Sequence, residues 1–137
     1  MANEALVKSV KEIAAASKAG NTEGAYRGYR DLFASEAFAS YRAEDQRQAL
    51  RLMILAKGQP GQPTPAMSEA YQNALGCLSR MLPLGDPGDH ELLGVCQLML
   101  GDEASANTTF RAGLAIERQR DPQSNLCGSL MKRVSML

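Results

Sequence analysis

The sequence predicts an all-α fold, and three observations lead to this prediction. Aromatic residues make up only 5% of the chain and Trp is absent, whereas β-sheets rely on aromatic and β-branched side chains. The apolar residues are mainly Ala, Leu and Met, which are good helix formers. Apolar positions recur at helical spacing, and the polar–apolar alternation that is typical of half-buried strands occurs nowhere in the sequence.

Composition limits the class of protein and the class of partner. The 137 residues, of which 45% are hydrophobic and 22% are charged, suit one folded domain with one core. Lys plus Arg equals Asp plus Glu at 15 each, so we expect no attraction to nucleic acid or to a membrane surface.

The longest apolar run, Leu52–Ala56, is too short to span a membrane, and the N-terminus lacks the features of a secretory signal. The expected location is therefore the cytoplasm.

The first predicted helical hairpin covers about residues 3–39. Gly20 and Asn21 interrupt its helical periodicity, and a Gly just past a helix end permits the positive φ that the chain needs there. Thr22 is the candidate cap of the second helix. Because the break is so short, the two helices must run antiparallel. The pattern does not decide the structure of residues 35–40.

The second predicted hairpin covers about residues 41–82. Its helices are expected at Tyr41–Lys57 and Ala66–Leu82. Between them, Gly58–Pro65 holds three prolines and two glycines, which excludes both a helix and a central strand. Pro65 stands where a first helical turn begins, a position that tolerates proline.

The third predicted hairpin covers about residues 89–119, and a last helix follows at about 122–135. Asp89 is the candidate cap of the hairpin's first helix. Gly101 and Asp102 break the periodicity in the same way as the first tight turn.

The two tight helix breaks share a pattern. Each has a Gly, then an Ala five positions later, then an aromatic residue four positions further along. The residues are Gly20, Ala25 and Tyr29 at the first break, and Gly101, Ala106 and Phe110 at the second. Self-similarity of this kind indicates a repeat architecture.

The second of these stretches resembles a tetratricopeptide repeat. In that family a large and a small residue are adjacent in the first helix, a Gly forms the turn, and an Ala, an aromatic and a small residue follow in the second helix. These places are filled by Leu93, Gly94, Gly101, Ala106, Phe110 and Gly113. The resemblance implies antiparallel hairpins of about 34 residues, stacked as a short superhelix and closed by a C-terminal capping helix. The alternative is another helical bundle, in which the last helix belongs to the core.

No catalytic, cofactor or metal site is predicted. The lone His90 lies beside Asp86, Asp89 and Glu91, but sequence neighbours at the start of a helix do not converge on one metal ion, and a capping cluster is the favoured interpretation. No phosphate-binding loop and no pairing of a nucleophile with a base is visible. Three widely spaced cysteines predict small core residues rather than disulfides: Cys77, Cys96 and Cys127.

The family resemblance also implies a binding surface. The first helices of stacked tetratricopeptide hairpins line a concave groove that binds a peptide or a helix of another protein. The expected groove residues are Val10, Ala14, Ser17 and Lys18 from the first hairpin, and Glu91, Val95, Leu98 and Met99 from the last. Methionine is adaptable at such surfaces. The alternative is that Val95, Leu98 and Met99 are core contacts.

The function expected from these observations is a non-catalytic protein–protein interaction module, such as an adaptor, a scaffold or a small chaperone. Small bacterial secretion chaperones resemble this chain in size and in repeat number. The alternative is a structural subunit whose apolar faces pair with copies of itself. A third, weaker alternative is an enzyme whose site the sequence does not reveal.

Overall fold

The computed structural model describes residues 4–56 and 63–137. Within these ranges the regular structure consists of eight α-helices and one short 3-10 helix, without any strand, so the all-α prediction is confirmed. None of the described helices is long and apolar enough to cross a membrane. The chain divides into two compact units, Met1–Cys77 and Leu78–Leu137, here called unit 1 and unit 2.

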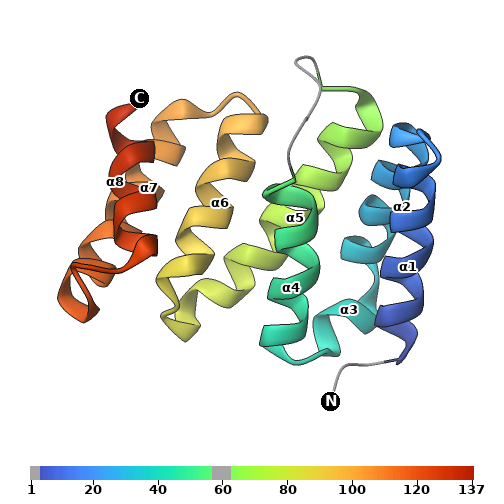
Figure 1. Cartoon of the computed structure of the whole chain (residues 1–137), viewed down its shortest axis with the longest axis horizontal. Helices are drawn as coiled ribbons and strands as arrows, with labels where there is room; N and C mark the ends of the chain where they lie inside the picture. Colours follow the sequence, from blue (N-terminus) through green and yellow to red (C-terminus); the bar gives the residue numbers. More distant parts are fainter. Residues whose placement is uncertain (1–3, 57–62) are drawn as a thin grey trace. The chain divides into compact units, whose positions relative to one another are not determined.

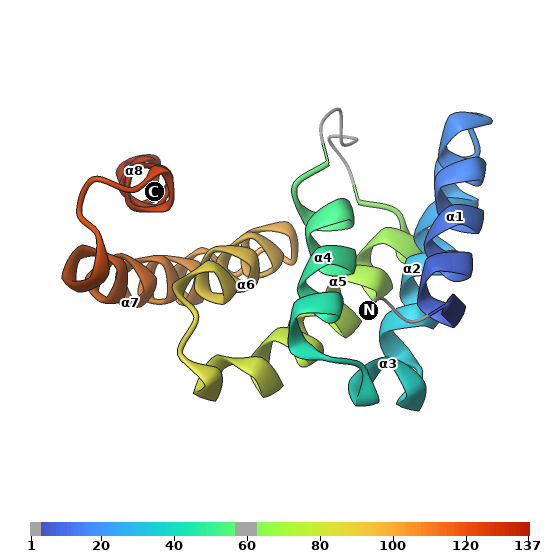
Figure 2. The same cartoon turned by 60° about the horizontal axis from the view of Figure 1, so that its bottom comes forward.

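Unit 1 is built from two layers of helices. In Figures 1 and 2, α1 and α4 lie in one layer, while α2 and the first part of α5 lie in the other. The short α3 connects α2 to α4. The bounds are α1 (Glu4–Lys18), α2 (Thr22–Ala34), α3 (Glu36–Ser40), α4 (Ala43–Ile54) and α5 (Pro65–Met81).

The turn between α1 and α2 is the predicted glycine hinge. Gly20 has a φ of 82°, and its N–H donates to the carbonyl oxygen of Ser17 at 3.0 Å. The N–H of Asn21 donates to the Ala16 carbonyl at 2.9 Å. With Gly20 in the left-handed backbone conformation, this bond closes the C-terminal end of α1. The predicted cap at Thr22 is wrong by one residue, because the Asn21 side chain reaches the free N–H of the first turn.

Residues 35–40, which the sequence pattern left undecided, form the end of α2 and the helix α3. The Ser35 hydroxyl donates to the Leu32 carbonyl at 2.8 Å and accepts from the N–H of Phe38 at 3.2 Å. One residue therefore ends α2 and caps α3. The Phe38 ring is fully buried and packs edge-on against Phe33, with centroids 5.2 Å apart.

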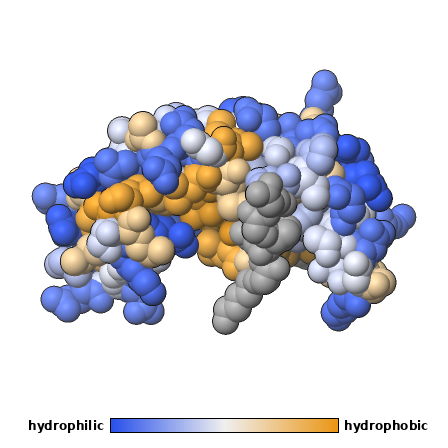
Figure 3. All heavy atoms as spheres, turned by 90° about the horizontal axis from the view of Figure 1, so that it is seen from above, coloured by the Kyte–Doolittle hydropathy of each residue, from blue (hydrophilic) through white to orange (hydrophobic). Residues whose placement is uncertain are grey.

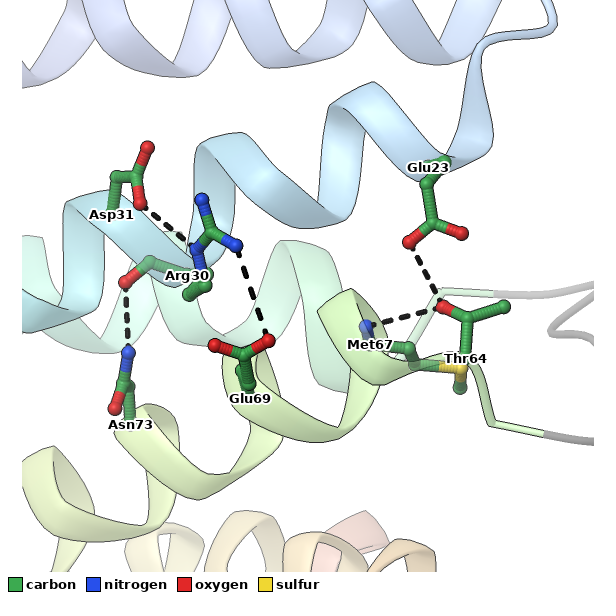
Figure 4. Close-up of polar contacts among 7 residues, drawn as sticks. All are labelled: Glu23, Arg30, Asp31, Thr64, Met67, Glu69 and Asn73. Carbon is green, nitrogen blue, oxygen red and sulfur yellow. Dashed lines mark hydrogen bonds and ion pairs between the residues drawn. The ribbon is translucent and has the colours of Figure 1, made fainter.

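Polar contacts hold α5 against α2 (Figure 4). The Thr64 hydroxyl donates to the Glu23 carboxylate at 3.0 Å, and the Asn73 amide donates to the Arg30 carbonyl at 2.9 Å. The Arg30 guanidinium also faces Glu69 at 4.0 Å. These contacts join residues that are 39 to 43 positions apart in the chain. They therefore fix a tertiary arrangement that local spacing does not specify.

Helix α5 begins at Pro65, as predicted. The N–H of Met67 donates to the Thr64 hydroxyl at 3.3 Å, which satisfies one backbone donor of the first turn. Most of the predicted loop Gly58–Pro65 falls on residues 57–62, which lie outside the described residues.

Unit 2 consists of an antiparallel helical pair and one further helix. Figures 1 and 2 show α6 and α7 side by side, and Figure 2 shows α8 end-on beside this pair. The end of α5 leads into the pair through η1. The bounds are η1 (Leu82–Leu84), α6 (Pro87–Met99), α7 (Glu103–Arg120) and α8 (Asn125–Ser135).

The turn between α6 and α7 repeats the chemistry of the first glycine hinge. Gly101 has a φ of 84°, and the N–H of Asp102 donates to the Gln97 carbonyl at 2.8 Å. The Asp102 carboxylate then accepts from the N–H of Ser105 at 3.1 Å and caps α7. Equivalent residues in the two predicted repeats therefore have equivalent roles.

The start of α6 corrects a prediction. The helix begins at Pro87, and the cap is Asp86, whose carboxylate accepts from the N–H of Gly88 at 2.9 Å. Asp89, the predicted cap, lies inside the first turn and is fully buried. Proline fits the first helical position because it has no N–H to satisfy, so the cap and the start of the helix lie three residues earlier than the pattern indicated.

The last helix, predicted from about residue 122, starts at Asn125. Ser124 is its cap, since the Ser124 hydroxyl accepts from the N–H of Cys127 at 3.0 Å. The same hydroxyl donates to the Glu117 carboxylate of α7 at 2.6 Å. Helix α8 buries Cys127 and Leu130, which attaches it to unit 2.

The cap of α7 gives stability a pH dependence that substitution can test. Hydrogen bonds from the Ser105 hydroxyl and backbone N–H hold the pKa of Asp102 below its ordinary value. A carboxylate with a lowered pKa stabilises the fold above its unfolded pKa of about 3.9 and loses this effect as the pH falls. The stability difference between the native chain and Asp102→Asn should therefore be larger at about pH 7 than at about pH 2, measured by urea unfolding.

The first hairpin supplies the matched control. Asn21 has the same capping role without a charge. Asn21→Asp should therefore introduce the pH dependence that Asp102→Asn removes. A stability difference for Asp102→Asn that is the same at both pH values would contradict this account of the cap.

Candidate functional site

A narrow cleft lies between α1 and α4 in unit 1, and we call it the α1–α4 groove. Its volume is about 160 Å³. It is lined by Leu6, Val7, Val10, Lys11, Asp45, Gln48, Ala49 and Leu52. Because the groove is formed by the helices of a single layer of unit 1, its geometry depends on unit 1 alone.

Large apolar side chains at the groove remain in contact with water. Val7 is 38% exposed and Leu52 is 53% exposed, and Leu55, one turn after Leu52, is 43% exposed. Leu6 and Ala49 beneath them are buried. Covering exposed apolar surface releases about 25 cal/mol per Å², and apolar residues gathered beside a cleft are typical of a binding surface.

The amphipathic pattern of α1 explains why it has both a core face and a groove face. Leu6 and Ile13 are seven residues apart on one side and are buried. Val7, Val10 and Ala14 follow at spacings of three and four on the neighbouring side. The apolar surface of α1 is thus wider than the stripe that the core can cover.

The acidic residue of the groove is already paired. Asp45 is buried, and its carboxylate accepts from the Arg42 guanidinium at 3.2 Å and 3.4 Å. The hydrogen bond from this guanidinium to Asp45 raises the pKa of Arg42. Gln48 is exposed and adds an amide that can donate and accept.

The predicted groove residues of α1 lie on one side of the helix. Val10 lines the α1–α4 groove and is half-buried. Ala14, Ser17 and Lys18 occupy the following turns and are exposed. They continue the side of α1 that Val10 belongs to, beyond the residues that line the cleft.

The predicted groove residues of α6 belong to unit 2 and divide into two pairs. Glu91 and Val95 are buried, and the Glu91 carboxylate accepts from the Ser129 hydroxyl and from Arg133 Nε, the latter at 2.8 Å. Leu98 and Met99 are half-exposed at the end of α6. Figure 3 shows apolar residues among hydrophilic ones at the left of the view, on the side of α6, α7 and α8.

The exposure of Val7, Leu52 and Leu55 was not predicted from the sequence. The available signal was the unbroken apolar run Leu52–Ala56, in which residues on opposite sides of one helix cannot all face the same core. Periodicity alone does not say which of Leu50 and Leu52 is buried, whereas the structure buries the former completely.

A second and larger groove lies on the other side of α1, against α2 and α3. Its volume is about 570 Å³, and it is lined by Ser9, Glu12, Ile13, Ala16, Gly24, Gly28, Asp31, Leu32, Ser35, Ala37 and Tyr41. Its large aliphatic residues, Ile13 and Leu32, are already buried. A partner would therefore gain little apolar burial there, which makes the α1–α4 groove the better candidate.

The polar cluster around His90 does not converge. Asp86 caps α6, Asp89 is fully buried, and Glu91 binds α8. The His90 side chain instead packs against Gly113 of α7, where an added Cβ would lie 2.6 Å from the Cβ of His90. Across residues 4–56 and 63–137, no three His, Cys, Asp or Glu side chains gather where they could hold a metal ion.

The cysteines offer no exposed thiol in the described parts of the chain. Cys77, Cys96 and Cys127 are buried and reduced, as small core residues commonly are.

Comparisons of this chain with protein-family models, with curated proteins and with solved structures found no match.

Proposed function

We propose that this chain is a non-catalytic protein-interaction module that binds an amphipathic helix of a partner protein in the α1–α4 groove. The observation that carries the proposal is the pair of exposed side chains, Val7 and Leu52, over a cleft with an apolar floor. No catalytic group is required for this activity.

The size of the groove favours a helix over a small molecule. Small-molecule sites enclose about 300 to 1,000 Å³, whereas the α1–α4 groove has about 160 Å³. A cleft of this size accommodates one or two side chains. A helix laid along it would insert apolar residues at spacings of three and four and would cover Val7 and Leu52.

A tetratricopeptide-like arrangement of the hairpins is part of the proposal. Both Gly-hinged turns have the same backbone and the same capping position, and Gly94 faces Phe110 where the family has a small and an aromatic residue. In such an arrangement α1 and α4 are the first helices of successive hairpins. The groove between them then corresponds to the surface that the family uses to bind peptides and helices.

Substitution of Leu52 tests the proposed site. Leu52→Gln should reduce retention of a partner at least tenfold, since it removes about 1.4 kcal/mol or more of apolar burial. The wild-type chain and the variant are immobilised and exposed to extract of the native cells, and retained proteins are quantified by mass spectrometry. Because Leu52 is 53% exposed, the fold should be unchanged by circular dichroism.

The control is Leu84→Gln, at a Leu that is 64% exposed in unit 2. It should retain the same partner as the wild-type chain. Equal retention by the wild type and both variants would reject the groove. Met99→Glu, measured alongside, determines whether the half-exposed end of α6 contributes: full retention limits the site to unit 1.

Self-association is the second candidate function. The observation in its favour is the exposed apolar end of the chain, where Met131 is 47%, Met136 75% and Leu137 45% exposed. Light scattering at two concentrations separates the two functions. A monomer at both concentrations excludes assembly through α8.

A further inference from the structure

The charges around the α1–α4 groove point to the chemistry of its ligand. We infer that the partner helix bound in this groove carries acidic residues beside its apolar stripe, an inference that rests on the proposed function. Some charges at the groove are already paired within the chain, and others are left for a partner.

Lysines on α1 are available to a partner. Lys11 lines the groove, and Lys18 lies two turns later on the same side of the helix. Both side chains are exposed, and neither forms an ion pair with any other residue that the structure describes. One ammonium group therefore stands beside Val7 and Val10 at the groove, and the second stands two turns further along α1, where a helix that extends past the cleft would meet it.

Carboxylates on α4 are not available in the same way. Asp45 accepts both hydrogen bonds from Arg42. Glu44 lies 3.6 Å from the guanidinium of Arg47 and 3.6 Å from that of Arg51, so its charge is shared between two cations. The α4 side of the groove thus offers no free negative charge to attract a basic ligand.

The acidic residues of α1 do not reverse this balance. Glu4 and Glu12 lie on a neighbouring face of α1 with Lys8, and none of the three lines the α1–α4 groove. Val7 and Lys11 lie at the border and line both surfaces. Glu12 also lines the second groove, which α1 forms with α2. The helix carries three lysines and two glutamates, and of these five charged residues only Lys11 lines the groove.

The size of the effect follows from exposed ion pairs. Each exposed ion pair strengthens binding by a factor of about 1.4 to 5, and like charges brought together weaken it by a similar factor. Two lysines should therefore favour a helix with acidic flanks over one with basic flanks by about tenfold at low salt. At about 1 M salt the Debye length is about 3 Å and the preference should largely disappear.

Two synthetic peptides of about 18 residues test the inference, a length that gives about five helical turns. Both carry the same leucines at spacings of three and four, and their flanking residues are all Glu in one and all Lys in the other. Fluorescence anisotropy with the full chain gives each Kd. We expect the Glu peptide to bind about tenfold more tightly, and the double variant Lys11→Glu/Lys18→Glu to reverse the order.

Two controls separate this inference from the proposed function. Lys132→Glu, at an exposed lysine of α8 in unit 2, should leave the ratio of the two Kd values unchanged. Leu52→Gln, which adds no charge, should weaken both peptides alike. If both peptides bind equally and both depend on Leu52, the acidic-ligand inference is overturned and the groove stands. If neither peptide binds, or if binding is independent of Leu52, both are overturned.

Discussion

Replacing Glu91 with Ala should lower the free energy of unfolding by about 2 to 3 kcal/mol. The Glu91 carboxylate joins α6 to α8 through Ser129 and Arg133. Removing one partner of a buried ion pair costs about 3 to 5 kcal/mol, because the remaining charge is left without compensation. The expected loss is smaller here because the Arg133 side chain is 30% exposed and regains some hydration. Urea unfolding of both proteins measures the difference.

Glu91→Gln separates the contribution of charge from that of hydrogen bonding. The Gln carbonyl oxygen can still accept from Ser129 and Arg133, so its loss of stability should be clearly smaller than that of Ala. The Arg133 guanidinium also lies 5.8 Å from the centroid of the Phe110 ring, a contact that both variants can keep. Unchanged stability of Glu91→Ala, combined with weaker partner capture, would instead place Glu91 on the binding surface.

Gly94→Ala should destabilise unit 2 by about 1 to 3 kcal/mol, although alanine is the better helix former. An added Cβ at this position would lie 2.6 Å from the Cδ1 of Phe110 and 2.7 Å from its Cζ. The Phe110 ring is fully buried, and close-packed interiors leave a large side chain little room to shift. The two helices would therefore have to separate, which weakens the packing between α6 and α7.

Gly128→Ala is the matched control for Gly94→Ala. Gly128 lies in α8, is exposed, and has no heavy atom within 4 Å of an added Cβ. Alanine there should raise stability by about 0.5 to 1 kcal/mol through helix propensity alone. Opposite signs for the two substitutions, in thermal or urea unfolding, are the expected result. A stabilising Gly94→Ala would contradict the close packing of α6 on α7.

The parts of the fold that the sequence predicted are those with local causes. The turns at Gly20 and Gly101 depend on a few neighbouring residues, and both were located correctly. The cap of α6 was misplaced because Asp86 and Asp89 both precede helical residues, and only the fixed φ of Pro87 makes the earlier start favourable.

The candidate site was less predictable because exposure is a tertiary property. Val10, which the resemblance to a repeat placed in a binding groove, lines the α1–α4 groove, and its role in binding stays a prediction. Glu91 was expected at a surface, but its partner Arg133 is 42 residues away in the chain. Val7 and Leu52 belong to apolar runs whose burial is decided only when α1 and α4 come together.

The two Gly-hinged turns have a consequence for how the chain finds its structure. Each turn brings together helices that are adjacent in sequence, α1 with α2 and α6 with α7. Closing so short a loop costs little chain entropy, and topologies dominated by such local contacts cross their folding barrier quickly. Each hairpin can therefore nucleate from its own residues. We therefore expect the long-range contacts from Glu23 to Thr64 and from Glu91 to Arg133 to form after the hairpins that they join.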